Sequence, residues 1–263
     1  MDLTSILGIV IGLGCILIGQ ALEGGSMQSL IQITAAFIVF GGTAGAVILS
    51  YPQQDLQQAV KELKTAFFNK KNDYEKVIAE VVGYAMKARK EGVIVLEKEA
   101  RNASDPLMKL GLEAVSDGAD PVLVRDLMET QLSQMEERVM RASKVWESAG
   151  GFSPTIGIIG AVLGLIQVMQ NLSEPSKLGA GIAVAFVATV YGVGAANLMF
   201  IPIGTKIKLK SKEDFLAKQI IIEGILSIQA GESPALIERK LNAFLLADKP
   251  QSDAQGAVKE ARA

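Results

Sequence analysis

The sequence predicts an all-α membrane protein with four transmembrane helices, arranged as two hairpins, and a helical cytoplasmic domain between spans two and three. Hydrophobic residues make up 49% of the 263 residues, and they fall in blocks. A helix needs about 20 mostly apolar residues to cross the hydrocarbon layer of a bilayer. Four stretches meet this length without any Asp, Glu, Lys, Arg or His, which disfavours a soluble fold: residues 3–22, 27–50, 152–172 and 178–203.

The first span resembles a secretion signal only superficially. Asp2 stands where such a signal carries basic residues, and the apolar run is longer than a typical signal core. We therefore expect this span to be retained. Cys15, the one cysteine, lies within it and cannot form an intramolecular disulfide, so we interpret it as a small packing residue.

The distribution of basic residues predicts the orientation in the membrane. All of the 26 Lys and Arg residues except Lys177 lie between the second and third spans or after the fourth. Cytoplasmic loops carry the excess of such residues, and the run Lys206, Lys208, Lys210 and Lys212 directly follows span four. We therefore expect both termini to be cytoplasmic. The net charge of −2 gives no reason to expect a nucleic-acid partner.

This topology predicts four segments. Residues 1–50 form a transmembrane hairpin, 51–150 a cytoplasmic helical domain, 151–203 a second hairpin, and 204–263 a cytoplasmic helical tail that is disordered at its end. The loops 23–26 and 173–177 are too short to hold an outer domain.

The cytoplasmic segments read as helices throughout, from their apolar spacing and from Asp-Pro pairs at helix starts. Gly92 is expected to end one helix. The last helix of the domain either continues into span three or breaks at Gly150–Gly151, the only candidate break between them. Residues 248–263 are polar and small, and we expect them to be disordered. The expected helices cover 55–68, 73–90, 93–101, a stretch from 106, a stretch from 121 to 148, 207–228 and 234–246.

The spans are rich in small residues placed four apart, which lets helix backbones approach closely in lipid. Any one pair is explained by ordinary packing within the chain, whereas their number favours extensive contacts, with contacts between subunits as one option. The pairs are Gly8/Gly12, Gly41/Gly45, Gly160/Gly164 and Ala188/Gly192/Ala196.

An ion pathway normally shows an ionisable side chain within the membrane, and these spans have no acid or base. If the protein conducts ions, the acceptor group must come from another chain. Polar residues that remain either bond their own backbone or line a wet cavity. They are Thr155, Gln167, Thr189, Tyr191 and Asn197. Pro154 and Pro202, near the cytoplasmic ends of spans three and four, are either boundary residues or hinges.

Several motifs together resemble the MotA/PomA family of flagellar stator subunits. Two lie in the spans: Ser-Pro-Thr-Ile-Gly-Ile-Ile-Gly at 153–160, and Tyr191-Gly192 followed by Phe-Ile-Pro at 200–202. A third, Lys-Ala-Arg-Lys-Glu-Gly at 87–92 followed by Leu-Glu-Lys-Glu at 96–99, lies in the cytoplasmic segment. The resemblance covers the chain up to its tail, with order and spacing kept.

The resemblance implies a homo-oligomer, thought to be a pentamer, in the bacterial inner membrane and surrounded by membrane lipid. The ring would enclose two copies of a MotB/PomB-like B subunit, each with one transmembrane helix carrying an aspartate. Ion flow past that aspartate would turn the ring against the rotor protein FliG. No enzyme activity and no cofactor are implied.

The resemblance also assigns roles to residues. Arg89 and Glu97 match charged residues that contact the rotor, with Lys90 and Glu99 in the same cluster. By pattern alone these four would be a solvated helix face, because exposed ion pairs contribute little.

In the spans, Pro154 and Pro202 match prolines linked to conformational coupling, and Thr189 matches a pore-facing threonine; we place Thr155 on the same pathway. Sodium-using relatives carry a threonine where this chain has Ala161, and a dehydrated cation needs oxygen ligands. We therefore expect the coupling ion to be H⁺ rather than Na⁺.

Three other functions fit the sequence less well. A TolQ/ExbB-type energiser of an envelope protein typically has three spans, and the extra N-terminal hairpin and the charged 89–99 segment favour the stator. A stand-alone transporter should show a substrate site or a midplane charge, and the sequence shows neither. A membrane enzyme is less favoured still, because the sequence has no histidine, no metal-ligand cluster and no nucleophile beside a base.

Overall fold

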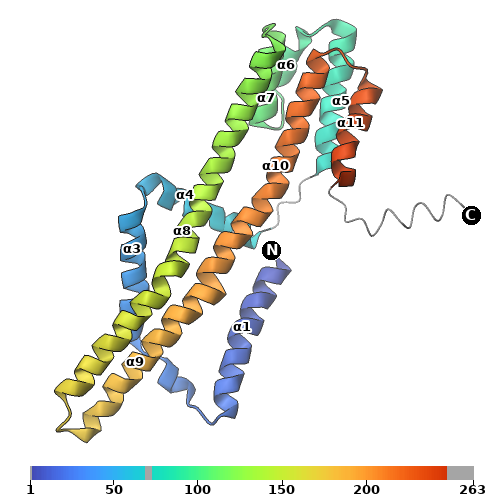
Figure 1. The fold of residues 1–263 in the computed structure, drawn as a ribbon. Coiled ribbons are helices and arrows are strands. Elements are labelled where there is room, and N and C mark those ends of the chain that lie inside the picture. Colours follow the sequence, from blue (N-terminus) through green and yellow to red (C-terminus); the bar gives the residue numbers. More distant parts are fainter. Residues whose placement is uncertain (1, 69–72, 248–263) are drawn as a thin grey trace, which may run out of the picture. The chain divides into compact units, whose positions relative to one another are not determined.

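The computed structural model describes residues 2–68 and 73–247, and every regular element in these ranges is a helix (Figure 1). The helical elements follow one another with short connections. In chain order they are α1 (Leu3–Leu22), η1 (Met27–Leu30), α2 (Ile33–Ala36), η2 (Phe37–Gly41), α3 (Gly42–Ser50), α4 (Gln53–Phe67), α5 (Tyr74–Glu91), α6 (Val95–Ala100), α7 (Pro106–Ser116), α8 (Pro121–Gln170), α9 (Pro175–Ala195), η3 (Ala196–Phe200), α10 (Ile201–Gln229) and α11 (Pro234–Ala247).

The chain divides into two compact units. The first comprises Met1–Lys70 and Glu137–Ser211, and the second Lys71–Glu136 and Lys212–Ala263. Four helical segments are long and apolar enough to cross a membrane, and they begin at Leu3, Met27, Pro121 and Leu178. The predicted fold class, an all-α membrane protein with four spans and a helical segment between the second and third, is confirmed.

Of the two alternatives for Gly150–Gly151, a break or a helix that continues into span three, the structure shows the continuous helix. Helix α8 runs through both glycines without interruption, from Pro121 to Gln170. The space around Gly150 explains why glycine stands there: a Cβ atom on it would lie 2.4 Å from Cγ1 of Ile201 in α10. The glycine therefore permits a close helix contact and does not interrupt the helix.

Two turns of π-helix interrupt the spans, and neither was predicted from the sequence. The first, η2, lies in span two, where the Thr43 hydroxyl donates a 2.6 Å hydrogen bond to the Val39 carbonyl. The second, η3, lies in span four and ends at Phe200, two residues before Pro202. Proline cannot donate to the carbonyl four residues back and its ring collides with it, and a π-turn is one of the ways in which a helix relieves such a conflict.

Spans three and four pack backbone against backbone. A Cβ atom on Gly192 would lie 2.6 Å from the Ser153 carbonyl oxygen, and one on Gly157 would lie 2.9 Å from the Ala188 carbonyl oxygen. Further out, a Cβ atom on Gly164 would lie 2.7 Å from the Gly181 carbonyl oxygen. These contacts explain why small residues recur on both helices, since only they allow such an approach.

Helix α4 is fixed against α8 within the first unit. The Trp146 indole donates a 3.0 Å hydrogen bond to the Ala59 carbonyl in the middle of α4, and Arg141 lies 3.7 Å from the Asp55 carboxylate. Tyr51, just before α4, donates to the Lys144 carbonyl at 3.1 Å and shares a 2.6 Å hydrogen bond with Ser148. These bonds hold the inner face of α4 across α8.

The second unit has its own apolar core, built from α5, α6, α7, the start of α8, the end of α10 and α11. Its largest fully buried side chains include Leu96, Leu112, Met128, Ile225 and Leu241. Between α7 and α10, an ion pair joins Asp105 to Lys218. This core holds α5 and α6 together, and they carry the charged residues discussed below.

Most of the predicted helix ends are correct to within two residues. Asp105 caps α7, with Pro106 in the first turn, and the Asp120 carboxylate accepts from the N–H of Val122 at the start of α8. Gly92 ends α5 with a φ angle of +84°, a value that glycine adopts readily. The predicted helix at 207–228 forms part of α10, which follows η3 of span four directly. The predicted disorder of 248–263 lies outside the described residues.

The close contact of spans three and four predicts a sharp difference between two glycines of the same helix. We expect Gly192→Ala to lower the stability of the detergent-solubilised protein by roughly 1–3 kcal/mol, because the new methyl group has no space. Gly194→Ala is the matched control, since nothing lies within 4 Å of the position of its Cβ, and it should leave the melting temperature equal or higher. Equal melting temperatures for the two variants would contradict the packing described.

Candidate functional site

The first candidate site is the charged surface at the end of α5 and the start of α6. Arg89, Lys90 and Glu97 are exposed, as expected for residues that meet a partner. Among the described residues, neither Arg89 nor Lys90 has an ion-pair partner, and Glu97 is held only by Arg101 at 3.7 Å. The Glu97 side chain remains 63% exposed and the Arg101 side chain 76% exposed, so this ion pair leaves the Glu97 carboxylate accessible to solvent.

Glu99 differs from the other three residues of the predicted cluster. Its carboxylate lies 2.7 Å from the Lys87 ammonium, and its side chain is only 18% exposed. The contact ties α6 to the last turns of α5. Glu99 therefore positions the two helices, whereas Arg89, Lys90 and Glu97 present charge outward.

A second tie fixes the loop that follows α6. Glu80 of α5 accepts hydrogen bonds from the N–H of Ser104 at 3.0 Å, from the Ser104 hydroxyl at 2.6 Å and from the Tyr84 hydroxyl at 2.8 Å. Burial by itself would raise the pKa of the Glu80 carboxyl, but these hydrogen bonds outweigh it and lower the pKa below its usual value. Burial and the bond to Glu80 raise the pKa of the Tyr84 hydroxyl.

The second candidate site is the predicted ion pathway in spans three and four. Thr155 is exposed, and Ala161 and Thr189 are partly exposed, so all three lie on surfaces that the chain leaves at least partly uncovered. The Thr155 hydroxyl donates to the Phe152 carbonyl at 2.8 Å, and the Thr189 hydroxyl to the Ala185 carbonyl at 3.2 Å. In this conformation both hydroxyls are occupied by their own helix, although each oxygen can still accept a hydrogen bond.

The two prolines have different surroundings. Pro154 lies inside α8 at the contact with span four, where its Cα would be 3.3 Å from a Cβ atom on Gly192. Pro202 is exposed, follows η3 and lines a small groove that also contains Ser5, Ile9, Leu198 and Met199. Each proline removes one helix hydrogen bond at a place where spans touch.

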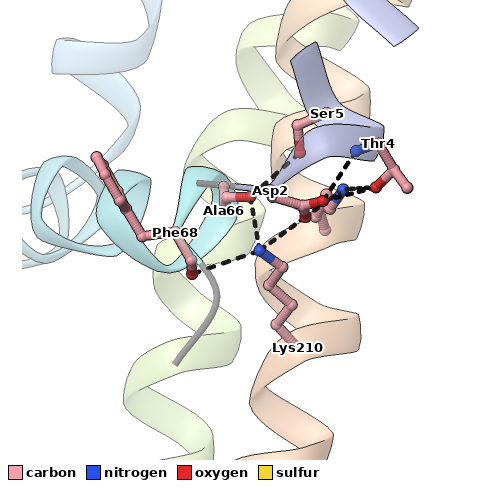
Figure 2. A network of polar contacts seen from close by, with 7 residues as sticks. Asp2, Thr4, Ser5, Ala66, Phe68 and Lys210 are labelled. Atoms are coloured by element: carbon pink, nitrogen blue, oxygen red, sulfur yellow. Dashed lines mark hydrogen bonds and ion pairs between the residues drawn. The ribbon is translucent and has the colours of Figure 1, made fainter. Parts of the chain in front are cut away.

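An ionic cluster joins the start of α1 to the start of α10 (Figure 2). The Asp2 carboxylate lies 2.6 Å from the Lys206 ammonium and 2.8 Å from that of Lys210, and it also accepts from the N–H and the hydroxyl of Thr4. Hydrogen bonds from Lys206 and Lys210 are the main reason that the pKa of Asp2 lies well below its usual value. Lys210 donates in addition to the Ala66 carbonyl at 3.0 Å, at the end of α4.

The roles of Asp2 and Lys87 were not predicted from the sequence. Asp2 was noted only as unlike a signal peptide, although an acid directly before an uncharged span and a run of lysines directly after another span could have indicated a pair. The ion pair of Lys87 could not be predicted from helix spacing, because it depends on how α6 folds back on α5. No group of three or more His, Cys, Asp or Glu residues that could hold a metal ion occurs in the part of the chain that the structure describes.

Comparison with known proteins agrees with this architecture. Residues 6–92 match the family model "Motility protein A N-terminal", and residues 99–220 match the "MotA/TolQ/ExbB proton channel family". Motility protein A of Helicobacter pylori is 36% identical, over 95% of this chain and 98% of its own length.

Two solved structures are also similar. That of the MotAB complex of C. jejuni has a TM-score of 0.87 and 33% identity, and covers 95% of this chain and 98% of that one. The flagellar MotAB stator complex from Bacillus subtilis has a TM-score of 0.84 and 31% identity, and covers 97% of this chain and 99% of that one.

Four spans in two hairpins, with a helical segment between the hairpins, are the architecture that this chain shares with the MotA chains of those stator structures. The chain belongs to the motility protein A family, within the MotA/TolQ/ExbB proton channel proteins.

The Glu80 cluster predicts a pH-dependent contribution to stability. The folded-state pKa of Glu80 is lowered from 4.5, so the ionised carboxylate stabilises the fold above that value, and this stabilisation is lost as the pH falls through the folded-state pKa. We expect Ser104→Ala to lower the free energy of unfolding by about 0.5–1.5 kcal/mol at pH 7, because the lost hydrogen bond is exposed to solvent. The difference from wild type should shrink below pH 4.5.

Denaturation of the full chain in detergent at pH 7 and pH 3.5 measures this difference. Ser133→Ala, an exposed change on α8, is the control and should match wild type at both values. A Ser104→Ala deficit that is the same at both pH values would show that ionised Glu80 does not contribute.

Proposed function

We propose that this chain is the A subunit of a flagellar motor stator, which forms a proton channel together with a MotB-like partner chain and converts ion flow into torque on the rotor. Membership of the motility protein A family carries this proposal. The similar solved structures are complexes of MotA with MotB, one of them described as a flagellar stator complex.

The geometry of the spans supports a pathway shared with another chain. Small residues hide one face of span three against span four, while Thr155, Ala161 and Thr189 remain on faces that this chain does not fully cover. The spans supply no acid, so a partner helix with one carboxylate against these faces would complete a proton relay. We place Pro154 and Pro202 as the points where spans three and four bend during the cycle.

We assign the rotor contact to Arg89, Lys90 and Glu97, with Glu99 as the residue that holds α6 in place. Their exposure and their mixed charge suit a transient electrostatic contact that must form and break quickly. The rotor partner we propose is FliG, and the assembly a pentamer in the inner membrane with both termini in the cytoplasm. Membrane lipid would surround the spans.

The family model that includes TolQ and ExbB leaves an envelope-protein energiser as the second candidate. The match of residues 6–92 to the N-terminal model of motility protein A favours the stator. A strain that lacks the chain decides between the two: we expect flagella to be built but not to rotate. Normal swimming of that strain, in the absence of a second stator, would refute the proposal.

Charge reversal tests the rotor contact. We expect Arg89→Glu to lower motor torque at least about fivefold, because like charges brought together cost several kcal/mol. Arg125→Glu reverses the charge of another exposed arginine, on α8 within the pair Arg125–Glu129, and should leave torque unchanged. Tethered-cell rotation and counts of assembled stators measure torque and assembly separately. A similar loss in both variants would indicate a general charge effect.

The coupling ion is tested by ion replacement. Ala161 offers no side-chain oxygen to a dehydrated cation, so we expect H⁺ coupling. Motor speed at a fixed proton-motive force should stay the same when sodium is replaced by choline. Strict dependence on sodium would instead show that backbone carbonyls or water serve as ligands in this protein.

A further inference from the structure

Two apolar residues, Val93 and Ile94, are exposed in the turn that joins α5 to α6 (Figure 1). Ile94 is 76% exposed, which makes it the most exposed large apolar side chain among the described residues of the second unit. Val93 beside it is 40% exposed. Surface turns normally carry Gly, Pro, Asn, Asp or Ser, so a Val-Ile pair departs from the local preference. Departures of this kind are typical of functional sites.

The ion pair between Lys87 and Glu99 closes this segment into a helical hairpin. Val93 lies midway between these two residues in the chain, so Val93 and Ile94, the apex pair, lie at the tip of the hairpin. The N–H of Leu96 donates a 3.0 Å hydrogen bond to the Val93 carbonyl, and the Leu96 side chain is fully buried. The apex pair is therefore held on a fixed backbone. Its β-branched side chains have few rotamers to lose, so covering them costs little conformational entropy.

The charges that we assign to the rotor contact lie close to the apex pair. Lys90 comes four residues before Ile94, and Glu97 comes three residues after it on α6. The N–H of Glu97 donates to the Ile94 carbonyl at 3.3 Å, so these two residues lie on one side of the first turn of α6. On α5, the exposed residues Met86, Arg89 and Lys90 share one side by their spacing of three and four. Charged side chains of both signs thus flank an apolar tip.

Charges alone would make a weak contact at this place. Exposed ion pairs contribute little, and salt at physiological concentration screens them beyond about 8 Å. Protein–protein interfaces instead combine an apolar centre, which is fully covered, with a polar rim. The apex pair and the charges beside it have this arrangement on a small scale.

We infer that the apex pair is the apolar centre of the rotor contact, and that the charges beside it form the rim. The partner surface that fits is a helical protein surface with an apolar groove that receives Ile94. It carries a carboxylate opposite Arg89 and a basic side chain opposite Glu97. This inference rests on the proposed function, because it takes this segment to meet the rotor. Burial of the apex pair then holds the rotor surface, while the charges orient it.

Binding of the rotor protein at two salt concentrations tests the apolar centre. The full chain, together with its partner chain, is held in nanodiscs and passed over a surface that carries purified FliG, in about 0.1 M or about 1 M NaCl. We expect Ile94→Thr, which keeps the β-branched shape, to bind about tenfold more weakly than wild type at both concentrations, because salt does not screen apolar burial. Ile94→Leu keeps the apolar surface and should bind within about twofold of wild type.

Two controls separate apolar burial from charge and from a general surface effect. Arg89→Gln should bind more weakly than wild type at the lower salt concentration and approach wild type at the higher one, where the Debye length is about 3 Å. Val122→Thr makes a similar change at a 66% exposed residue of α8 and should bind as wild type does. Because Ile94 is exposed, Ile94→Thr should keep the wild-type melting temperature.

Wild-type affinity of Ile94→Thr, together with weaker binding by Arg89→Gln, would overturn the apolar centre and leave an electrostatic rotor contact, so the proposed function would stand. An equal loss in Ile94→Thr and Val122→Thr would also overturn it, because the loss would not depend on the apex pair. A change in the size of the assembly, without a change in affinity for FliG, would show that a second copy of this chain covers the apex pair. Absence of binding by the wild type at both salt concentrations would refute the rotor contact itself.

Discussion

The contact between spans three and four governs much of the first unit. Lipid offers no hydrophobic force to bring helices together, so they associate through close packing and weak contacts to backbone carbonyls. Gly157 and Gly192 permit this, because side chains there would collide with the opposite backbone. The contact hides the smallest residues of both helices. Polar residues on the neighbouring faces, such as Thr155, Thr189 and Asn197, are consequently left exposed or only partly covered.

In the second unit, some charged residues hold helices in place, whereas others face solvent. Two ties, the hydrogen bonds of Glu80 with Ser104 and the ion pair of Lys87 with Glu99, hold α6 and the loop after it against α5, and both acids are only partly exposed. Two acids, Glu80 and Glu99, and one lysine, Lys87, of this charged segment therefore have partners within the chain. The remaining charges on the outward side, Arg89, Lys90 and Glu97, are then free to meet a partner. A cluster that looks uniform along the chain thus has two roles, which differ in how far each side chain is buried.

Beside the start of span one, an ionic cluster joins α1, α4 and α10. Asp2 would be costly beside an uncharged span if it were alone, but two lysines compensate it and hold its pKa low. The cluster also closes the end of α4, since Lys210 and the N–H of Asp2 bond to carbonyls there. Three segments distant in sequence are therefore joined at one point, and the groove beside Pro202 lies next to it.

The sequence alone determined the four spans, the helical class and the family resemblance, because length, absence of charge and motif order are properties of the chain itself. Helix starts at Asp105 and Asp120 were equally readable, since a cap acts within a few residues. Only the tertiary structure decided that Gly150 serves a contact rather than a break, that Glu99 differs from Glu97, and that Asp2 reaches Lys206. Each depends on which residues distant in the chain come within a few ångströms, and local spacing carries no record of that.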